Sequence, residues 1–477
     1  MYFVEVILPL SLAKTFTYRV SEAEFHFVKN GMRVVVPFGK SKMYTALIIG
    51  KHQNEPALYE AKEIDQILDE NPIVTQIQIT HWEWIASYYM CAIGDVYRGA
   101  MPSALLLESE TIVSQKQSVI IEENILSDEE YLVYQALQQQ SSLRIQDITS
   151  ILNKKNVFPV IQKLIDKNVL VLQEEVQELY KPKLVRYVRL HSKYHSDSGL
   201  SDLLDVLKGA AKQREIVLTY FQLNAKESQP ISVKQLIEVA NSTSSIIKVL
   251  IEKEIFEEYF IQEDRVNFQG NAQEAALELS KAQQQACDQI TSHFETKEVC
   301  LLHGLTSSGK TEIYIKLIEE QLASGKQVLY LLPEIALTTQ LVGRLRTYFG
   351  DKVGVYHSKY SNNERVELWK QVLEQSPKAQ IVIGARSALF LPFSNLSLIV
   401  VDEEHEQTFK QVDPAPRYHA RDAAIVLANA HQAKVLLGSA TPSIESYFNA
   451  QSDKYGLVEI TERYGNVQLP EIELVDL

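Results

Sequence analysis

The sequence predicts a multidomain α/β chain, and three observations support this fold class. Residues 1–109 contain short β-rich runs broken by glycine and proline. Residues 110–268 are dominated by helical patterns, and one stretch of them recurs further along the chain. From residue 269 onward, strongly apolar runs of strand length alternate with stretches of helical length. The 477 residues suffice for several domains of ordinary size, so each pattern is assigned to a domain of its own.

The composition limits the class of protein without choosing a function. Hydrophobic residues make up 45% of the sequence and charged residues 23%, as in ordinary globular proteins. We expect no membrane span, because no apolar run reaches roughly 18 residues, and the first residues resemble a strand more than a signal peptide. The three dispersed cysteines exclude a disulfide framework and a cysteine-rich zinc site within this chain. We expect a cytoplasmic location.

The net charge of −14 argues mildly against nucleic-acid binding, because attraction to phosphates is the largest sequence-independent term in such binding. An acidic protein can still hold DNA where basic and aromatic groups are concentrated locally. The charge of the whole chain therefore does not decide the matter.

The runs "FVEVILPL", "FTYRV", "GMRVVVPFG" and "YTALIIGKH" predict a small barrel or curled sheet in residues 1–109. The following "THWEWIASYYM" places Trp82, Ile85, Tyr88 and Tyr89 at helical spacing. We predict that this helix packs on the preceding sheet.

The next region contains an internal repeat. Residues 160–170, "VIQKLIDKNVL", resemble residues 246–256, "IIKVLIEKEIF", which lie 86 positions later. Each copy has the pattern of a helix, a short helix, an amphipathic helix and a strand, separated by turns, which is typical of a winged helix. We predict a winged-helix domain in residues 110–180, and a second winged-helix-like segment with a linker in residues 181–268. DNA binding and a spacer or protein-contact role both stay open, because few basic residues mark the third helices.

The region 269–465 has the pattern of a parallel sheet with crossover helices. The runs "VCLLHG", "VLYLLP", "QIVIGA", "LSLIVVD" and "KVLLGSAT" are apolar throughout, as expected of strands buried on both faces. We predict a RecA-like, doubly wound lobe.

A phosphate-binding loop follows the first of these strands. Residues 304–311, "GLTSSGKT", match G-x-x-x-x-G-K-T between a strand and a helix, which is the context that the motif requires. The glycines allow a tight turn whose N–H groups cradle phosphate, Lys310 reaches the β- and γ-phosphates, and Thr311 offers a hydroxyl to Mg²⁺. The predicted nucleotide contacts are Gly304, Thr306, Ser307, Ser308, Gly309, Lys310 and Thr311.

Two further motifs belong to the same site. The strand "LIVVDEEH" ends in Asp402 and Glu403, which we predict to hold Mg²⁺ and to position or activate the attacking water. Together with Lys310 they are the predicted catalytic residues. "GSATPS" follows the next strand, and its Ser439 and Thr441 are predicted to couple hydrolysis to a nucleic-acid side.

Taken in order, "GLTSSGKTEIY", "LLPEIALTTQ", "GARSALFLPF", "VDEEHEQTFKQ", "RYHARD" and "GSATPSIESY" resemble the PriA family of bacterial replication-restart helicases. "LPLSLAKTFTYRV" and "YYMCAIGDVYRGAMP" resemble that family's 3′-end DNA-binding domain. The resemblance covers nearly the whole chain and is weakest between residues 175 and 265. It implies a superfamily 2 helicase that moves 3′ to 5′, uses ATP and Mg²⁺, recognises stalled or branched forks and initiates primosome assembly. The implied partners are forked DNA with single-stranded and 3′-end features, single-stranded DNA-binding protein and helicase-loading proteins.

The resemblance also assigns residues. Gln283 corresponds to an adenine-contacting amide, and His405 to a γ-phosphate contact or its sensing network. The implied DNA contacts of the motor lobe outside the aromatic-rich loop are Thr338 and Arg386. Those of the 3′-end pocket are Phe16, Thr17, Gly39 and Lys62, although Phe16 also fits an aromatic in the core of a barrel. Thr17 stands where the family usually has aspartate. Its hydroxyl can hydrogen-bond a 3′-OH, but unlike the aspartate carboxylate it is not ionised.

Residues 409–422 resemble the aromatic-rich loop shared by the PriA and RecQ families. This loop reports bound single-stranded DNA to the ATP site. Aromatic rings stack on bases and basic groups meet phosphates, so the implied DNA contacts are Phe409, Lys410, Arg417, Tyr418 and Arg421.

The chain ends at "LPEIELVDL", where the family begins its second lobe, so residues 466–477 are expected to start a missing lobe. The family's zinc sites are expected only in that portion, and this single-lobe chain is expected to be weakly active or inactive alone. Two alternatives stay open: another superfamily 2 translocase such as a RecG-like motor, and an ATP-gated fork-binding platform without motor activity.

Overall fold

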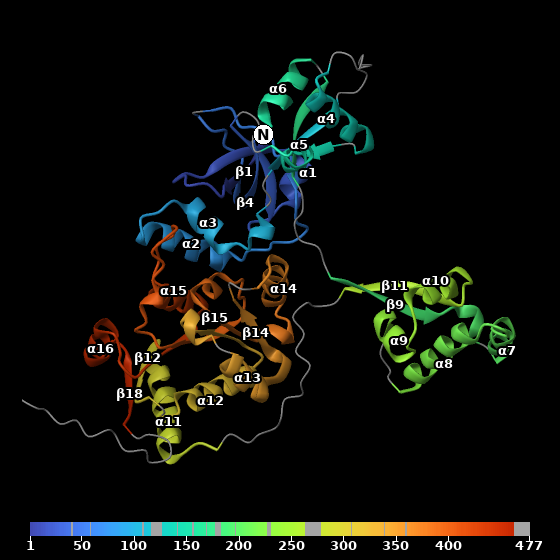
Figure 1. Ribbon diagram of the computed structural model, residues 1–477. Helices are drawn as coiled ribbons and strands as arrows, with labels where there is room; N and C mark the ends of the chain where they lie inside the picture. The colour runs from blue at the N-terminus through green and yellow to red at the C-terminus, as the bar shows by residue number, and fades with distance from the viewer. Residues whose placement is uncertain are drawn as a thin grey trace, which may run out of the picture. The chain divides into compact units, whose positions relative to one another are not determined.

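The computed structural model describes residues 1–39, 42–57, 59–106, 109–115, 126–140, 142–154, 157–167, 169–176, 183–195, 197–226, 230–262, 278–306, 308–337, 339–357 and 360–461 (Figure 1). They form two compact units, one of Met1–Tyr180 with Phe268–Leu477 and one of Lys181–Asn267. None of the described helices is long and apolar enough to cross a membrane.

The first unit begins with a five-stranded antiparallel sheet in the order β2-β1-β4-β3-β5. Its strands are β1 (Tyr2–Ile7), β2 (Phe16–Val20), β3 (Arg33–Phe38), β4 (Lys42–His52) and β5 (Gln66–Ile67). Alternate residues of β1 and β3, such as Val4 and Val34, are buried in one core cluster, which explains the apolar runs of the sequence. The short helix α1 (Glu22–Phe27) starts at a capping box in which Ser21 and Glu24 satisfy each other's backbone N–H groups.

Two helices connect this sheet to the rest of the unit, α2 (Gln76–Tyr88) and α3 (Ile93–Ala100). Trp82 of α2 is completely buried and belongs to the same core cluster as Trp369. The indole Nε1 of Trp369 donates to the carbonyl of Ile73 at 2.8 Å, and Gln78 Nε2 donates to the carbonyl of Phe390 at 2.6 Å. The sequence predicted that α2 packs on the N-terminal sheet; the structure shows that it also joins that part of the chain to the motor lobe.

The repeat seen in the sequence is confirmed as two copies of one arrangement. Each copy has a strand, a helical segment, a short strand, two helices and a final strand. In the first copy these are β6 (Ser109–Gln115), α4 (Asp128–Gln139), β7 (Ser142–Arg144), α5 (Ile145–Leu152), α6 (Phe158–Asp166) and β8 (Leu170–Val176). In the second they are β9 (Leu184–Leu190), α7 (Asp197–Val206), α8 (Ala211–Lys226), β10 (Ile231–Ser232), α9 (Val233–Val239), α10 (Ser244–Glu252) and β11 (Phe256–Gln262).

In each copy the strand that leads the repeat lies in the centre of a three-stranded sheet, in the orders β7-β6-β8 and β10-β9-β11. The sequence pattern did not reveal these two leading strands. The second copy is the smaller of the two compact units.

The motor lobe has a seven-stranded, fully parallel sheet in the order β14-β15-β13-β16-β17-β12-β18. Its strands are β12 (Val299–Gly304), β13 (Gln327–Leu331), β14 (Val353–Tyr356), β15 (Ile381–Gly384), β16 (Leu396–Asp402), β17 (Lys434–Ser439) and β18 (Gly456–Ile460). The five strands predicted from apolar runs are all present. The two that the sequence did not reveal, β14 and β18, are the strands at the two edges of the sheet.

Helices cover both faces of this sheet, as in a RecA-like lobe (Figure 1). They are α11 (Lys281–Thr296), α12 (Lys310–Ala323), α13 (Thr339–Phe349), α14 (Asn362–Leu373), α15 (Ala420–His431) and α16 (Ile444–Gln451). Neighbouring strand residues belong to different core clusters: Leu301 and Leu329 to one, Leu302 and Tyr330 to the other. The strands are therefore buried on both sides, which is why they are apolar throughout.

Candidate active site

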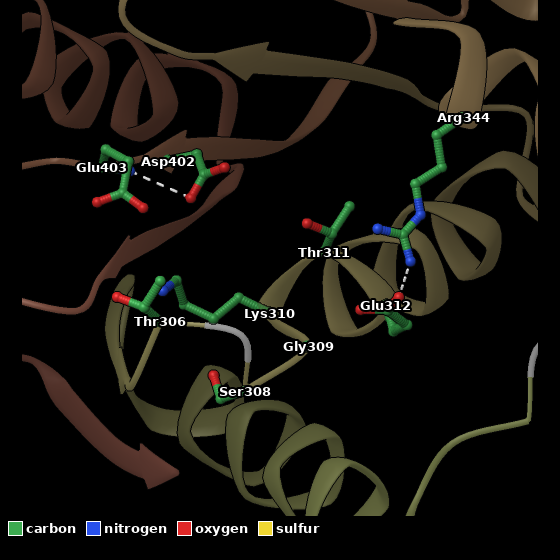
Figure 2. Close-up of a pocket in the computed structure, with 9 residues that line it drawn as sticks. All are labelled: Thr306, Ser308, Gly309, Lys310, Thr311, Glu312, Arg344, Asp402 and Glu403. Carbon is green, nitrogen blue, oxygen red and sulfur yellow. Dashed lines mark hydrogen bonds and ion pairs between the residues drawn. The ribbon is translucent and has the colours of Figure 1, made fainter. Parts of the chain in front are cut away.

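Three loops meet at one edge of the motor sheet. The phosphate-binding loop starts at the last residue of β12, the acids start at the last residue of β16, and "GSATPS" starts in the last two residues of β17, which lies between those two strands. The carboxyl ends of parallel strands share an edge, and ligands bind there in open α/β sheets. A pocket of about 470 Å³ opens at this edge, as Figure 2 shows. Its lining residues are Thr306, Ser308, Gly309, Lys310, Thr311, Glu312, Arg344, Asp402 and Glu403.

The two loop glycines are required for different reasons. Gly309 precedes α12 with a φ of +81°, a conformation that glycine adopts without strain. A Cβ there would also lie 2.1 Å from Gln283 Nε2. At Gly304 the backbone is unstrained, but a Cβ would lie 2.8 Å from Ser308 Oγ. The tight turn therefore leaves no room for a side chain at either position.

Polar groups of the loop suit a nucleotide's phosphates. Lys310 Nζ donates to the Gly304 carbonyl at 3.0 Å, so its ammonium lies over the loop. The buried Ser308 Oγ has no hydrogen-bond partner among the described residues. The N-terminus of α12 points into the same pocket, where its N–H groups and dipole favour an anion. These residues fit a phosphate chain with Mg²⁺, and the predicted contact Ser307 lies outside the described residues.

Gln283 has protein partners at both ends of its amide. Its Oε1 accepts from the Ser280 backbone N–H at 2.8 Å, and its Nε2 donates to the Gly309 carbonyl at 3.3 Å. Gln283 is also buried, with only 1% of its surface exposed. The residue therefore ties the start of α11 to the phosphate-binding loop, and contact with adenine stays a prediction.

The two predicted catalytic acids differ in their surroundings. Burial raises the pKa of Asp402, while hydrogen bonds from Tyr330 and Tyr314 lower it. The pKa of Glu403 is raised by burial and by the negative charge of Asp402, and lowered by Lys310. Glu403 adopts a positive φ of +50°, and its N–H donates to Asp402 Oδ1 at 3.1 Å. This bend turns Glu403 into the pocket beside Asp402 (Figure 2).

The predicted coupling residues meet the acid motif through a histidine. His405 Nδ1 lies 2.7 Å from Ser439 Oγ and 3.7 Å from a carboxylate oxygen of Glu403. Its Nε2 lies 3.4 Å from Thr441 Oγ1. A hydrogen-bonded chain therefore connects the ends of β16 and β17.

Sequence reasoning missed two residues of the pocket. Glu312 in the first turn of α12 forms an ion pair with Arg344 of α13, and both line the pocket (Figure 2). Arg344 belongs to no motif of the sequence, and nothing in its local pattern distinguishes it from a surface arginine.

The structure places the two predicted base-stacking aromatics of the loop after the acids in the core, and their contact with DNA stays a prediction. Phe409 and Tyr418 are each only 1% exposed, so their rings belong to the core instead of being offered to bases. The Tyr418 hydroxyl donates to the Arg386 carbonyl at 3.0 Å, and its ring packs edge-to-face on Phe390 at 5.0 Å. Both rings belong to a buried core cluster that also contains residues of α2 and α15, such as Trp82 and Ala424.

The basic residues of the loop are also engaged. Arg421, 8% exposed, forms a buried ion pair with Glu404 at 2.9 Å, and its contact with a DNA phosphate stays a prediction. Lys410 Nζ donates to the Arg417 carbonyl at 2.6 Å and lies 4.9 Å from the Tyr89 ring centre. The side chain of Arg417 stays 66% exposed.

Arg386 Nη1 donates to the carbonyl of Thr408 at 3.1 Å, so this predicted DNA contact holds the backbone of the loop. Thr338, the other DNA contact predicted for the lobe, lies outside the described residues.

The four residues of the expected 3′-end pocket lie together. Phe16, Thr17, Gly39 and Lys62 line a pocket of about 290 Å³, with Tyr18, Pro37, Phe38, Tyr59 and Glu60. Lys62 Nζ donates to the Gly39 carbonyl at 2.8 Å, and the Thr17 N–H donates to the Tyr59 hydroxyl at 2.9 Å. Phe16 is half-buried and packs edge-to-face on Phe38 at 5.1 Å. It is therefore both a packing residue and a wall of the pocket, while Tyr59 and Phe38 are walls that the sequence did not indicate.

Family models match four parts of the chain. Residues 5–102 match the PriA 3′ DNA-binding domain, and residues 280–449 match the DEAD/DEAH box helicase. Residues 110–175 match a winged helix domain, and residues 185–262 match the winged helix domain of PriA helicases of Bacteroidota.

Relatives match along the whole chain. Replication restart protein PriA of Bacillus subtilis is 31% identical, over 100% of this chain and 58% of its own length. Its counterpart in Haemophilus influenzae is 33% identical, over 100% of this chain and 54% of its own. The chain thus spans about half the length of the curated relatives it matches. Among solved structures, RecG bound to a three-way DNA junction is 18% identical with a TM-score of 0.31, over 47% of this chain and 27% of that one.

Proposed function

The chain belongs to the PriA family of replication restart proteins, and from this premise we propose that it is the ATP-binding part of a DNA helicase that acts at stalled or branched replication forks. The main observation in support is the meeting of three motifs at one sheet edge around a pocket of about 470 Å³.

The residues of the pocket have complementary roles in ATP hydrolysis. When bound, Mg²⁺ neutralises charge on the phosphates and orients them. Thr311 and Asp402 would hold the metal, and Lys310 would stabilise the charge that develops on the γ-phosphate. Glu403 would orient the attacking water and accept its proton, and its raised pKa brings it nearer to the working pH of a general base.

The N-terminal pocket would take the 3′-terminal nucleotide of a nascent strand. The rings of Phe16 and Tyr59 offer faces for a base, and Lys62 offers a cation for phosphate. The Thr17 hydroxyl would hydrogen-bond the 3′-OH. Movement from 3′ to 5′ along DNA, loading of the primosome, and contacts with single-stranded DNA-binding protein and helicase loaders are part of this proposal, as is a cytoplasmic location.

A second candidate for the chain by itself is an ATP-gated platform that binds forks without motor work. It is favoured by the burial of Phe409 and Tyr418 and by the ion pair of Arg421 with Glu404. In this conformation of the loop, none of the three side chains is exposed for contact with DNA. A RecG-like translocase is not proposed, since residues 5–102 match the PriA 3′ DNA-binding domain.

The test is ATP hydrolysis with a fork that carries a free leading-strand 3′ end, compared with the same fork blocked by a 3′-phosphate. We expect the free end to stimulate more strongly, and Lys310→Ala to abolish hydrolysis while fork binding persists. The measurement is made on this chain and on a version extended to the length of its relatives. Stimulation only in the extended version supports the platform for this chain, and no stimulation in either overturns the helicase proposal.

A further inference from the structure

We propose that Tyr314 and Tyr330 are positioning residues that fix the carboxylate of Asp402 for its part in metal binding, and that Gly438 is a glycine because the Tyr314 hydroxyl needs its side-chain space. The inference rests on the proposed function, because it assigns Asp402 to Mg²⁺ at the ATP site.

The two hydroxyls reach Asp402 from different elements. Tyr314 lies on α12 and donates to Asp402 Oδ1 at 3.0 Å. Tyr330 lies on β13 and donates to Oδ2, also at 3.0 Å. The rings are fully buried and meet edge-to-face with their centres 5.6 Å apart. Each carboxylate oxygen has its own donor, so the carboxylate can neither rotate nor flip without breaking a hydrogen bond.

The hydroxyls serve Asp402 rather than the core. A phenylalanine would fill either position with nearly the same apolar volume and without a polar group to satisfy. Each hydroxyl lies 3.0 Å from a carboxylate oxygen, which can only accept, so the phenol is the donor in both hydrogen bonds. A buried carboxylate that accepts such hydrogen bonds is stabilised in its charged form. The charged form is the one that a metal ion requires.

The structure gives a steric reason for the glycine at position 438 in "GSATPS". It lies on β17 directly beside Asp402 in the parallel register. Its φ is not in the left-handed region, so the backbone alone does not demand glycine there. A Cβ at this position would lie 1.8 Å from the Tyr314 hydroxyl and 2.9 Å from the ring carbon that bears it. The side chain is therefore absent because the Tyr314 hydroxyl occupies its space.

One of the two carboxylate oxygens of Asp402 can accept a further hydrogen bond. Oδ1 accepts from the Tyr314 hydroxyl and from the Glu403 N–H, whereas Oδ2 has the Tyr330 hydroxyl as its one donor among the described residues. A carboxylate oxygen can accept about two hydrogen bonds. The free acceptor capacity on Oδ2 suits a water molecule of the Mg²⁺ shell.

The experiment measures the affinity of a fluorescent ADP analogue with Mg²⁺ and, separately, with EDTA. In the wild type Mg²⁺ should tighten binding. In Tyr314→Phe and Tyr330→Phe we expect that tightening to fall by about 10- to 100-fold, the range found when partners of a metal ligand are removed. The affinity in EDTA and the melting temperature should change little. Tyr356→Phe is the matched control, because this buried tyrosine on β14 bonds to Arg365 and lies outside the site.

A double mutant tests the role of Gly438. Gly438→Ala alone should reduce the Mg²⁺-dependent tightening as much as Tyr314→Phe does, because the new methyl displaces the hydroxyl. In a Tyr314→Phe background the same substitution should cost less, because the hydroxyl that it displaces is already gone.

Three results would count against the inference. If Tyr314→Phe and Tyr330→Phe keep the full tightening of ADP-analogue binding by Mg²⁺, the positioning role is overturned. They could lose affinity equally in Mg²⁺ and EDTA, which would show a purely structural role. If the wild type binds no nucleotide under either condition while remaining folded, the proposed function fails first and the positioning role with it.

Discussion

Three adjacent carboxylates at the end of β16 acquire different roles from their surroundings. Asp402 is held by two tyrosine hydroxyls, Glu403 turns into the pocket on a bent backbone, and Glu404 is completely buried. Glu404 accepts hydrogen bonds from Arg421, from the Ser443 backbone and hydroxyl, and from Ser446. The third acid is therefore a structural anchor between α15 and α16, a role that the motif alone did not indicate.

Loss of Glu404 should destabilise the motor lobe. Glu404→Ala removes the fully buried carboxylate that pairs with Arg421 and accepts from Ser443 and Ser446, and breaking a buried pair typically costs about 3–5 kcal/mol of the free energy of unfolding, less here in so far as Asp422 still pairs with Arg421. Urea denaturation would measure it. Asp413→Ala is the control, because that side chain is 81% exposed and should stay within about 0.5 kcal/mol of the wild type. Equal stability of the two variants would contradict the anchoring role.

The raised pKa of Glu403 predicts the pH dependence of hydrolysis. A general base acts only when deprotonated, so the rate should rise with pH through the raised pKa and be lost below it. The acidic limb should therefore lie at higher pH than the ordinary pKa of glutamate would place it. The rate measured from pH 4.5 to 8 tests this. Glu374→Gln, an exposed residue outside the pocket lining, should keep the limb, and a flat profile in the wild type would exclude Glu403 as the base.

At the level of elements, strand order assembles the site. β17 lies between β12 and β16, so the loops that follow these strands become neighbours although they are far apart in sequence. The start of α11 is tied to the phosphate-binding loop by Gln283, which bonds both Ser280 and Gly309. The loop is therefore supported by a helix that precedes its own strand.

This connection predicts how nucleotide binding responds to Gln283→Ala. If Gln283 supports the loop, the substitution should weaken ATP and GTP to a similar extent, by several-fold, because phosphate contacts are common to both. If Gln283 instead contacts adenine, the substitution should weaken the binding of ATP and leave that of GTP unchanged. Competition between the two nucleotides for a fluorescent analogue distinguishes the cases, and selective loss of ATP would refute the supporting role. Gln284→Ala is the control, since that neighbour is exposed and bonds only along its own helix.

At the level of the whole first unit, α2 joins the N-terminal sheet to the motor lobe. His81 of α2 is buried, and its Nε2 lies 2.9 Å from the carbonyl of Ala423 on α15. Burial lowers the pKa of His81 to about 4. A side chain of α2 therefore contacts the backbone of α15 directly, and α15 follows the loop of Phe409 and Tyr418.

This histidine predicts an acid-sensitive interface. The folded pKa lies below the ordinary value of 6.5, so the unfolded chain binds the proton more readily. Stability contributed by neutral His81 is present above pH 6.5 and lost as the pH falls toward 4, by about 2 kcal/mol between pH 7 and pH 5. His81→Gln should reduce that loss in urea denaturation, whereas the exposed His26→Gln should not. Burial also lowers the pKa of His431 to about 4. This second histidine therefore contributes its own loss of stability at low pH, which remains in His81→Gln. An unchanged pH dependence in His81→Gln would exclude this assignment.

The sequence by itself determined the α/β class, the repeat of the winged helices, the five central strands and the motifs at their ends. These features are local: a phosphate-binding loop or a buried strand is written in consecutive residues. The four predicted members of the N-terminal pocket are not consecutive in the chain, and it was the resemblance that identified them.

Only the tertiary structure decided which side chains meet across the sheet. Tyr314, Tyr330 and Gly438 surround Asp402 from three elements separated by many residues, and Arg344 reaches Glu312 from another helix. Phe409 and Tyr418 looked like base-stacking aromatics, but an aromatic side chain is buried or exposed according to what packs opposite it. That partner is set by strand order and by the docking of α2, neither of which is recorded in the neighbouring residues.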